Sequence, residues 1–203
     1  STPVGGSALH LAANNLLKKS KKFVSCKLNV NEEEINYKNG VFFYKSDSFS
    51  LAEISSLFSS QNDSLSSYES WAPPSGTFTY PNGTHICELE IDKETGMVDI
   101  LSYSIVDDFG KVINPLLLEG QVHGGTVQGI GQALLEETIY DSTSGQLLSG
   151  SFMDYALPRA SDLPNFKFSY NEILCKTNLL GVKGAGEAGA IGAPPAVTDD
   201  CIF

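Results

Sequence analysis

The chain has 203 residues, with 13 basic and 24 acidic side chains and a formal net charge of -11 at pH 7. This length allows one medium domain, or two small ones, with a proper hydrophobic core. The acidic balance argues against a nucleic-acid partner, because proteins that bind the phosphate backbone present basic surfaces. No apolar run approaches the roughly 18 residues that cross a bilayer, so we expect a soluble chain without a membrane span.

The four cysteines, Cys26, Cys87, Cys175 and Cys201, are widely separated. They are too far apart for a CxxC metal site and too few for a disulfide scaffold in a chain of this length. We therefore expect a reducing, cytoplasmic compartment. The chain opens on Ser1 and closes on an apolar residue, Phe203, so we expect it to be cut from a longer protein.

Residues 1–76 are predicted to form an N-terminal α+β segment with a serine-rich loop. Apolar residues at helical spacing predict a helix over 7–19, followed at its C-terminal end by lysines that the helix dipole favours. The Asn39-Gly40 pair lies between two short apolar runs and predicts a hairpin. Nothing in this segment indicates catalysis.

Ser50 and Glu53 have the spacing of a capping box, which predicts a short helix continuing through Phe58. The serine-rich stretch that follows, residues 59–70, is predicted to be a surface connection.

The second segment, residues 77–203, begins with a predicted long hairpin. Alternation of apolar and polar residues over 85–91 and 97–105 surrounds a turn at Asp92–Gly96. His85 and Cys87 share one face of the first strand. A pair without a further ligand nearby favours core packing over a metal site, and we predict no metal held by protein side chains.

Residues 120–137 show near-helical apolar spacing but contain five glycines, each of which costs about 1 kcal/mol of helix propensity relative to Ala. Two explanations remain open: close packing against another helix, or close approach of the backbone to a bulky ligand. Gln121, His123 and Gln128 favour the ligand, since buried amides need polar partners.

The densest glycine segment is 181–192, where five of twelve residues are Gly around a single acid, Glu187. We predict a loop that holds this carboxylate as a general base, and an ordinary glycine-rich loop with an exposed Glu is the alternative. Residues 184–189 also match GxGxxG. The chain ends 14 residues after Gly189, which leaves no room for the strand and acid of a dinucleotide-binding unit.

Seven motifs in this order resemble the C-terminal part of the molybdopterin-binding large subunit of the xanthine oxidase and aldehyde oxidase family of molybdenum hydroxylases. The resemblance is greatest to the branch named for the aerobic carbon monoxide dehydrogenase large subunit. It is strong over about 77–203 and poor over 20–76. The motifs are Thr79–His85, Asp92–Gly96, Asp107–Pro115, Glu119–Gly125, Gln128–Leu134, Gly150–Arg159 and Gly181–Gly189.

The resemblance implies an α+β fold with mixed sheets, hairpins, helices and glycine-rich cofactor loops. It also implies that Glu187 is the base that takes a proton from a hydroxide on molybdenum, which then attacks an electron-poor carbon. The residues that it implies for cofactor binding are Gln121, Gly124, Gly125, Gln128, Gly129, Lys183, Gly184, Ala185, Gly186 and Ser1.

Asp108, Asn114 and Pro115 are expected to shape the loop that leads into the cofactor helix. His123 stands where distant members of the family carry an acid, and either polar lining of the cofactor site or packing remains open for it.

The implied cofactor is molybdenum-molybdopterin in its cytosine dinucleotide form, with 2Fe-2S and FAD on partner subunits or domains. The implied partners are the remainder of the large subunit, an iron-sulfur subunit, an FAD subunit and a small-molecule substrate, in a dimer of heterotrimers. The substrate is an aldehyde, an N-heterocycle or one of the carbon monoxide type. A non-catalytic scaffold or assembly fragment that lacks the cofactor is the alternative function.

Overall fold

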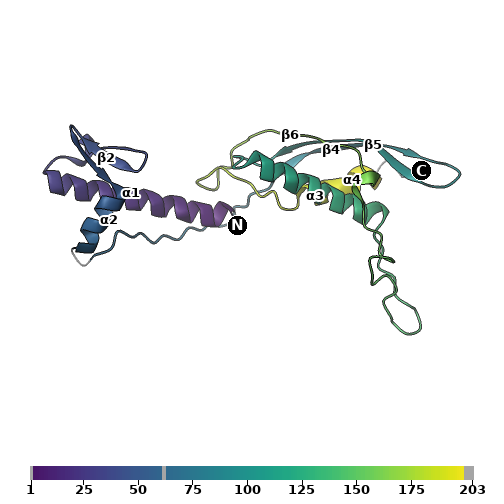
Figure 1. Ribbon diagram of the computed structural model, residues 1–203. Helices are drawn as coiled ribbons and strands as arrows, with labels where there is room; N and C mark the ends of the chain where they lie inside the picture. Colours follow the sequence, from purple (N-terminus) through teal and green to yellow (C-terminus); the bar gives the residue numbers. More distant parts are fainter. Residues whose placement is uncertain (1, 61–62, 199–203) are drawn as a thin grey trace. The chain divides into compact units, whose positions relative to one another are not determined.

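A computed structural model describes residues 2–60 and 63–198 of the chain (Figure 1). The chain divides into two compact units, the first ending at Pro73 and the second beginning at Pro74. Each unit combines helices with antiparallel hairpins, which confirms the predicted α+β class. None of the helices in the described ranges combines the length and apolar character that a membrane crossing needs.

The first unit is built on a helix longer than predicted. A π-helical turn at Thr2–Gly6 leads into α1 (Ser7–Leu28), which ends where Asn29 adopts the left-handed conformation with φ 52°. The predicted end near residue 19 is wrong. Phe23, Val24 and Leu28 extend the apolar stripe onto the core of this unit, so the lysines lie within the helix instead of at its end.

The hairpin and the capping box of the first unit are confirmed. Strands β1 (Asn36–Lys38), β2 (Val41–Tyr44) and β3 (Asp47–Ser50) form an antiparallel sheet that turns through Asn39 and Gly40, both with positive φ. Helix α2 (Leu51–Ser60) follows at once. Ser50 N–H donates to Glu53 Oε2 at 2.7 Å, and Glu53 N–H donates to Ser50 Oγ at 3.2 Å. A short 3-10 helix, Glu32–Glu34, precedes the sheet.

The second unit is a three-stranded sheet with two helices on one face. Strands β4 (Asn82–Ile91) and β5 (Val98–Asp108) form the predicted long hairpin, and β6 (Lys167–Tyr170) runs parallel to β5 at its other edge. Helices α3 (Pro115–Leu134) and α4 (Ala188–Thr198) pack against this sheet (Figure 1). Cys87 and Tyr103 of the sheet share one core with Val122 and Val197 of the helices.

Helix α3 begins five residues before the predicted Gly120, at a capped N-terminus. The side-chain oxygen of Asn114 accepts a hydrogen bond from Leu117 N–H at 3.2 Å, and Pro115 occupies the first helical position. Proline is favoured there because an N–H at the first helical position would have no acceptor within the helix, so its absence costs no hydrogen bond. Both residues thus form the entry into the helix. A 3-10 turn, Ala160–Asp162, lies between α3 and β6.

The prediction of a loop over the whole of 181–192 is wrong, because its last five residues belong to α4. Glycines allow α3 and α4 to approach closely. A Cβ added at Gly189 would lie 2.5 Å from both Val122 O and Thr126 N, and one at Gly129 would lie 2.9 Å from Ala193 Cβ. Tertiary packing therefore outweighs the poor helix propensity that made this segment look like a loop.

We expect Gly189→Ala to destabilise the second unit by at least about 2 kcal/mol, because the new methyl group meets backbone atoms that cannot move aside. Gly120→Ala is the matched control. A Cβ there has no neighbour within 4 Å, and the change from Gly to Ala in an exposed helix is neutral or stabilising by up to about 1 kcal/mol. Thermal or denaturant unfolding measures both. Equal losses in the two variants would contradict this packing role.

Candidate functional site

The candidate site lies on the loop that joins residue 181 to α4. Glu187 is exposed and stands directly before the first residue of α4. Within residues 2–60 and 63–198, its carboxylate makes no hydrogen bond or ion pair. Gly184 and Gly186 are exposed as well, and a Cβ on either would meet no atom within 4 Å. The free carboxylate therefore stands beside open backbone.

The beginning of this loop is paired with the end of the hairpin. Lys183 N–H donates to Phe109 O at 2.8 Å, and Lys111 N–H donates to Gly181 O at 2.8 Å. Gly110 lies between them with φ 64°, and a side chain there would strike the carbonyl oxygen of Gly181. The close crossing of the two backbones therefore requires glycine at position 110.

A buried ion pair joins the same two segments. The Lys183 ammonium contacts Asp108 Oδ2, while Asp108 Oδ1 accepts hydrogen bonds from Gly110 N–H at 2.8 Å and Ile173 N–H at 3.1 Å. Burial raises the pKa of Asp108, but the bonds from Lys183 and the two N–H groups outweigh it and hold the pKa below its ordinary value. The amine predicted to line the cofactor is thus engaged with Asp108.

One face of α3 reaches the loop. Gln121 Nε2 donates to Gly186 O at 2.8 Å, so this amide contacts the residue immediately before Glu187. Gly124 and Gln128 follow at spacings of three and four residues and are exposed like Gln121. Residues at this spacing share one helix face. Gln121 therefore lies beside the glutamate loop, and Gly124 and Gln128 lie farther along the same face of α3.

Other predicted positions face elsewhere. Gly125 and Gly129 are buried against α4, so they serve helix packing, and Ala185 packs against the core. His123 lies edge-on to the rings of Phe166 and Phe168, and its Nε2 is buried without a partner in the described part of the chain. This geometry favours packing for His123. Ser1 lies outside the described residues.

Sequence reasoning missed a buried polar cluster under α4. His85 Nδ1 is 3.0 Å from Tyr103 Oη, and His85 Nε2 is 3.5 Å from Asp107 Oδ1. The imidazole also packs on the backbone of α4, where a Cβ added at Gly192 would lie 2.6 Å from it. Among the residues with described placement, no group of three His, Cys, Asp or Glu side chains is arranged to hold a metal ion.

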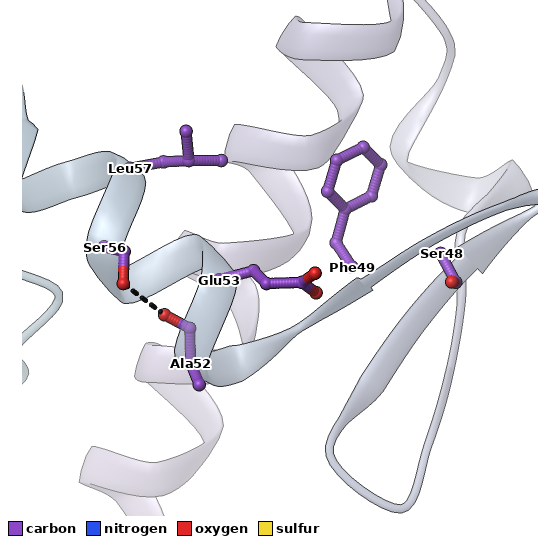
Figure 2. Close-up of a pocket in the computed structure, with 6 residues that line it drawn as sticks. All are labelled: Ser48, Phe49, Ala52, Glu53, Ser56 and Leu57. Atoms are coloured by element: carbon purple, nitrogen blue, oxygen red, sulfur yellow. Dashed lines mark hydrogen bonds between the residues drawn. The ribbon is translucent and has the colours of Figure 1, made fainter.

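The first unit has a hollow of about 500 Å³ between β3 and α2 (Figure 2). Figure 2 shows Glu53 extending from α2 toward the strand that carries Phe49, with Ser56 bonded back to the carbonyl of Ala52. The Glu53 carboxylate already caps α2 through Ser50. The hollow therefore offers no free ionisable group for chemistry.

Comparison with known proteins identifies the class. The model of the molybdopterin cofactor-binding domain family matches residues 1–164. The chain is 31% identical over 98% of its length to the carbon monoxide dehydrogenase large chain of Hydrogenophaga pseudoflava. It is 35% identical over its full length to the gamma subunit of the 6-hydroxypseudooxynicotine dehydrogenase complex of Paenarthrobacter nicotinovorans. It spans 25% and 27% of these two relatives.

Solved structures also align with this chain. A crystal structure of the Cu,Mo-CO dehydrogenase aligns with 98% of this chain at a TM-score of 0.84 and 30% identity, over 26% of its own length. Quinoline 2-oxidoreductase from Pseudomonas putida 86 aligns with 91% at a TM-score of 0.76 and 30% identity, over 25% of its own length. The chain belongs to the molybdopterin cofactor-binding domain family and corresponds to about a quarter of a molybdopterin oxidoreductase large subunit.

The depressed pKa of Asp108 predicts an acid-dependent contribution to stability. Stability from a carboxyl group whose pKa is lowered on folding is present above its unfolded pKa of about 3.9 and is lost as the pH falls through the folded pKa. We expect Asp108→Asn to lower the free energy of unfolding by about 3 kcal/mol at pH 7 and to flatten its dependence on pH below about 4.

Glu172→Gln is the control for this prediction, because Glu172 pairs with Lys111 in a more exposed ion pair. We expect a much smaller loss for this variant at pH 7, since exposed pairs are screened by solvent. Denaturant titrations of the purified protein between pH 3 and 7 measure both variants. An unchanged acid dependence in Asp108→Asn would contradict the assignment.

Proposed function

We propose that this chain supplies the catalytic base and part of the cofactor surface of a molybdenum-dependent hydroxylase or dehydrogenase. One observation carries the proposal: Glu187 presents a free carboxylate from a backbone that Gln121 and the buried packing of α4 hold in place. A general base must combine a fixed position with an unengaged carboxylate. Membership of the molybdopterin cofactor-binding family supplies the chemical context.

The described residues fit a large cofactor. The exposed face of α3 and the loop beside it present glycines, at positions 124, 184 and 186, where a Cβ would enter open space. Backbone without side chains admits the close approach of a bulky flat group. Gln121 keeps its side-chain oxygen, and Gln128 keeps its amide, for polar contacts with a pterin.

Molybdenum-molybdopterin, when bound, supplies the two-electron oxidising centre and activates oxygen derived from water. For an aldehyde or an N-heterocycle, the balanced reaction takes a substrate C–H group and water to C–OH, with release of two electrons and two protons. For carbon monoxide, carbon monoxide and water give carbon dioxide with the same release of two electrons and two protons. In this scheme, Glu187 takes up the proton of the water-derived nucleophile as that oxygen attacks the electron-poor carbon of the substrate. Gln121 and Gln128 orient the pterin, and Ser1 contacts its pterin or phosphate end.

The cofactor form and the partners complete the proposal. The cytosine dinucleotide form is proposed, with electrons passing to 2Fe-2S and FAD centres on partner subunits in a dimer of heterotrimers. The named relatives include a carbon monoxide dehydrogenase, a 6-hydroxypseudooxynicotine dehydrogenase and a quinoline 2-oxidoreductase. An aldehyde, an N-heterocycle or a carbon monoxide-type substrate is therefore proposed, oxidised in the cytoplasm.

Glu187→Gln tests the base. Because the change removes only the ability to accept a proton, we expect kcat to fall by about 10²–10⁴-fold while molybdenum and pterin content stay unchanged. Steady-state kinetics normalised to bound molybdenum measure the effect. Glu172→Gln, whose side chain lies on a different loop, is expected to keep wild-type turnover. Full activity of Glu187→Gln would support a scaffold fragment instead.

Analysis of the native complex tests the proposed cofactor and its cytosine dinucleotide form. We expect about one molybdenum per chain and release of a cytidine nucleotide on acid hydrolysis, as measured by elemental analysis and chromatography. A folded, fully assembled complex without molybdenum would overturn the hydroxylase proposal.

A further inference from the structure

Two anchors hold the backbone that leads into Glu187. The first is Lys183, fixed through its N–H on Phe109 O and through its ammonium on Asp108. The second is Gly186, whose carbonyl accepts the hydrogen bond from Gln121. Only two residues, Gly184 and Ala185, separate these anchors, and Ala185 packs against the core.

Side-chain packing does not restrict the two glycines of this segment, because a Cβ added at Gly184 or Gly186 would meet no atom within 4 Å. Glycine has many accessible backbone conformations, so the path of the chain here depends on the anchors and on the packing of Ala185. A shift of about 1 Å in a catalytic group can cost 10²-fold in rate. The position of Glu187 therefore depends on these anchors on one side and, on the other, on α4, where Ile191 N–H donates to Glu187 O at 2.9 Å.

The Asp108 side chain has a fixed position from which it can hold Lys183. Its side chain is nearly fully buried at the end of β5, and two backbone N–H groups fix one of its oxygens. The other oxygen is left for Lys183, which keeps only 12% of its side-chain surface exposed. The ion pair thus transmits the rigidity of the sheet to the glycine-rich loop.

We propose that the Asp108–Lys183 ion pair is a positioning pair for Glu187. The inference rests on the proposed function of Glu187 as the base. Both residues act through the loop backbone, four residues before the carboxylate. Breaking the pair leaves Lys183 held only by its backbone bond to Phe109 O, so the loop between residue 183 and the start of α4 is fixed less firmly. Turnover then falls without loss of the cofactor or the proton acceptor.

The test compares Lys183→Met, Asp108→Asn and the double variant in the native complex, with a substrate that the wild-type complex oxidises. We expect kcat per bound molybdenum to fall by about 10- to 100-fold in each single variant, with KM changed by less than about threefold. Because the two side chains act as one unit, the double variant should lose no more than the larger single loss. Lys183→Arg, which keeps the charge, should recover most of the turnover.

Lys111→Met is the matched control. It removes a neighbouring ion pair, 3.1 Å long and more exposed, that does not reach the Glu187 loop, and it keeps the backbone bond to Gly181 O. Wild-type kcat is expected for this variant. Should Lys183→Met fail to assemble, Asp108→Asn carries the same test, because it keeps the size and shape of the side chain.

Wild-type kcat per molybdenum in the single variants would overturn the positioning pair, even if they melt at lower temperature, because a purely structural pair changes stability and not turnover. Additive losses in the double variant would overturn it too. Glu187→Gln in parallel separates the two proposals. If Glu187→Gln loses activity and the pair variants keep normal kcat, only the positioning pair is overturned. If Glu187→Gln keeps its activity, the proposed base is overturned.

Discussion

The close contact between α3 and α4 is the constraint on which the candidate site depends. Each helix places glycine where the other comes nearest, at Gly125 and Gly129 on one side and Gly189 on the other. Dense packing of this kind compensates for the helix propensity that glycine lacks, since buried contacts replace intrinsic preference. The first turn of α4 is thereby fixed against α3, and Glu187 stands directly before it.

Two sets of glycines surround the candidate site. One set is buried and permits close approach of helices or backbones, as at Gly110 against the carbonyl of Gly181. The other set, including Gly124, Gly184 and Gly186, faces open space, where the absence of a side chain leaves backbone accessible to a ligand. Helix packing and ligand approach thus occur together, at different residues of the same segment.

Two polar contacts, in addition to helix packing, fix the loop that precedes Glu187. Gln121 bonds to Gly186 O, and the Asp108–Lys183 pair ties the loop to the end of the hairpin. Both contacts join residues more than 60 positions apart, so they form only when the sheet, α3 and the loop are assembled. The Glu187 carboxylate takes part in neither. A fixed backbone with an unengaged carboxylate is the geometry that proton abstraction requires.

The sequence alone determined the elements with strong local signals. The Asn39-Gly40 turn, the Ser50–Glu53 capping box and the alternating hairpin follow from short-range chemistry, and the ordered motifs identified the family. Tertiary structure decided the rest. The extension of α1 through Phe23 and Leu28, the helical state of residues 188–192 and the pairing of Lys183 with Asp108 all depend on contacts with distant segments. Local propensity carries no information about such contacts, because the stabilising partner lies elsewhere in the chain.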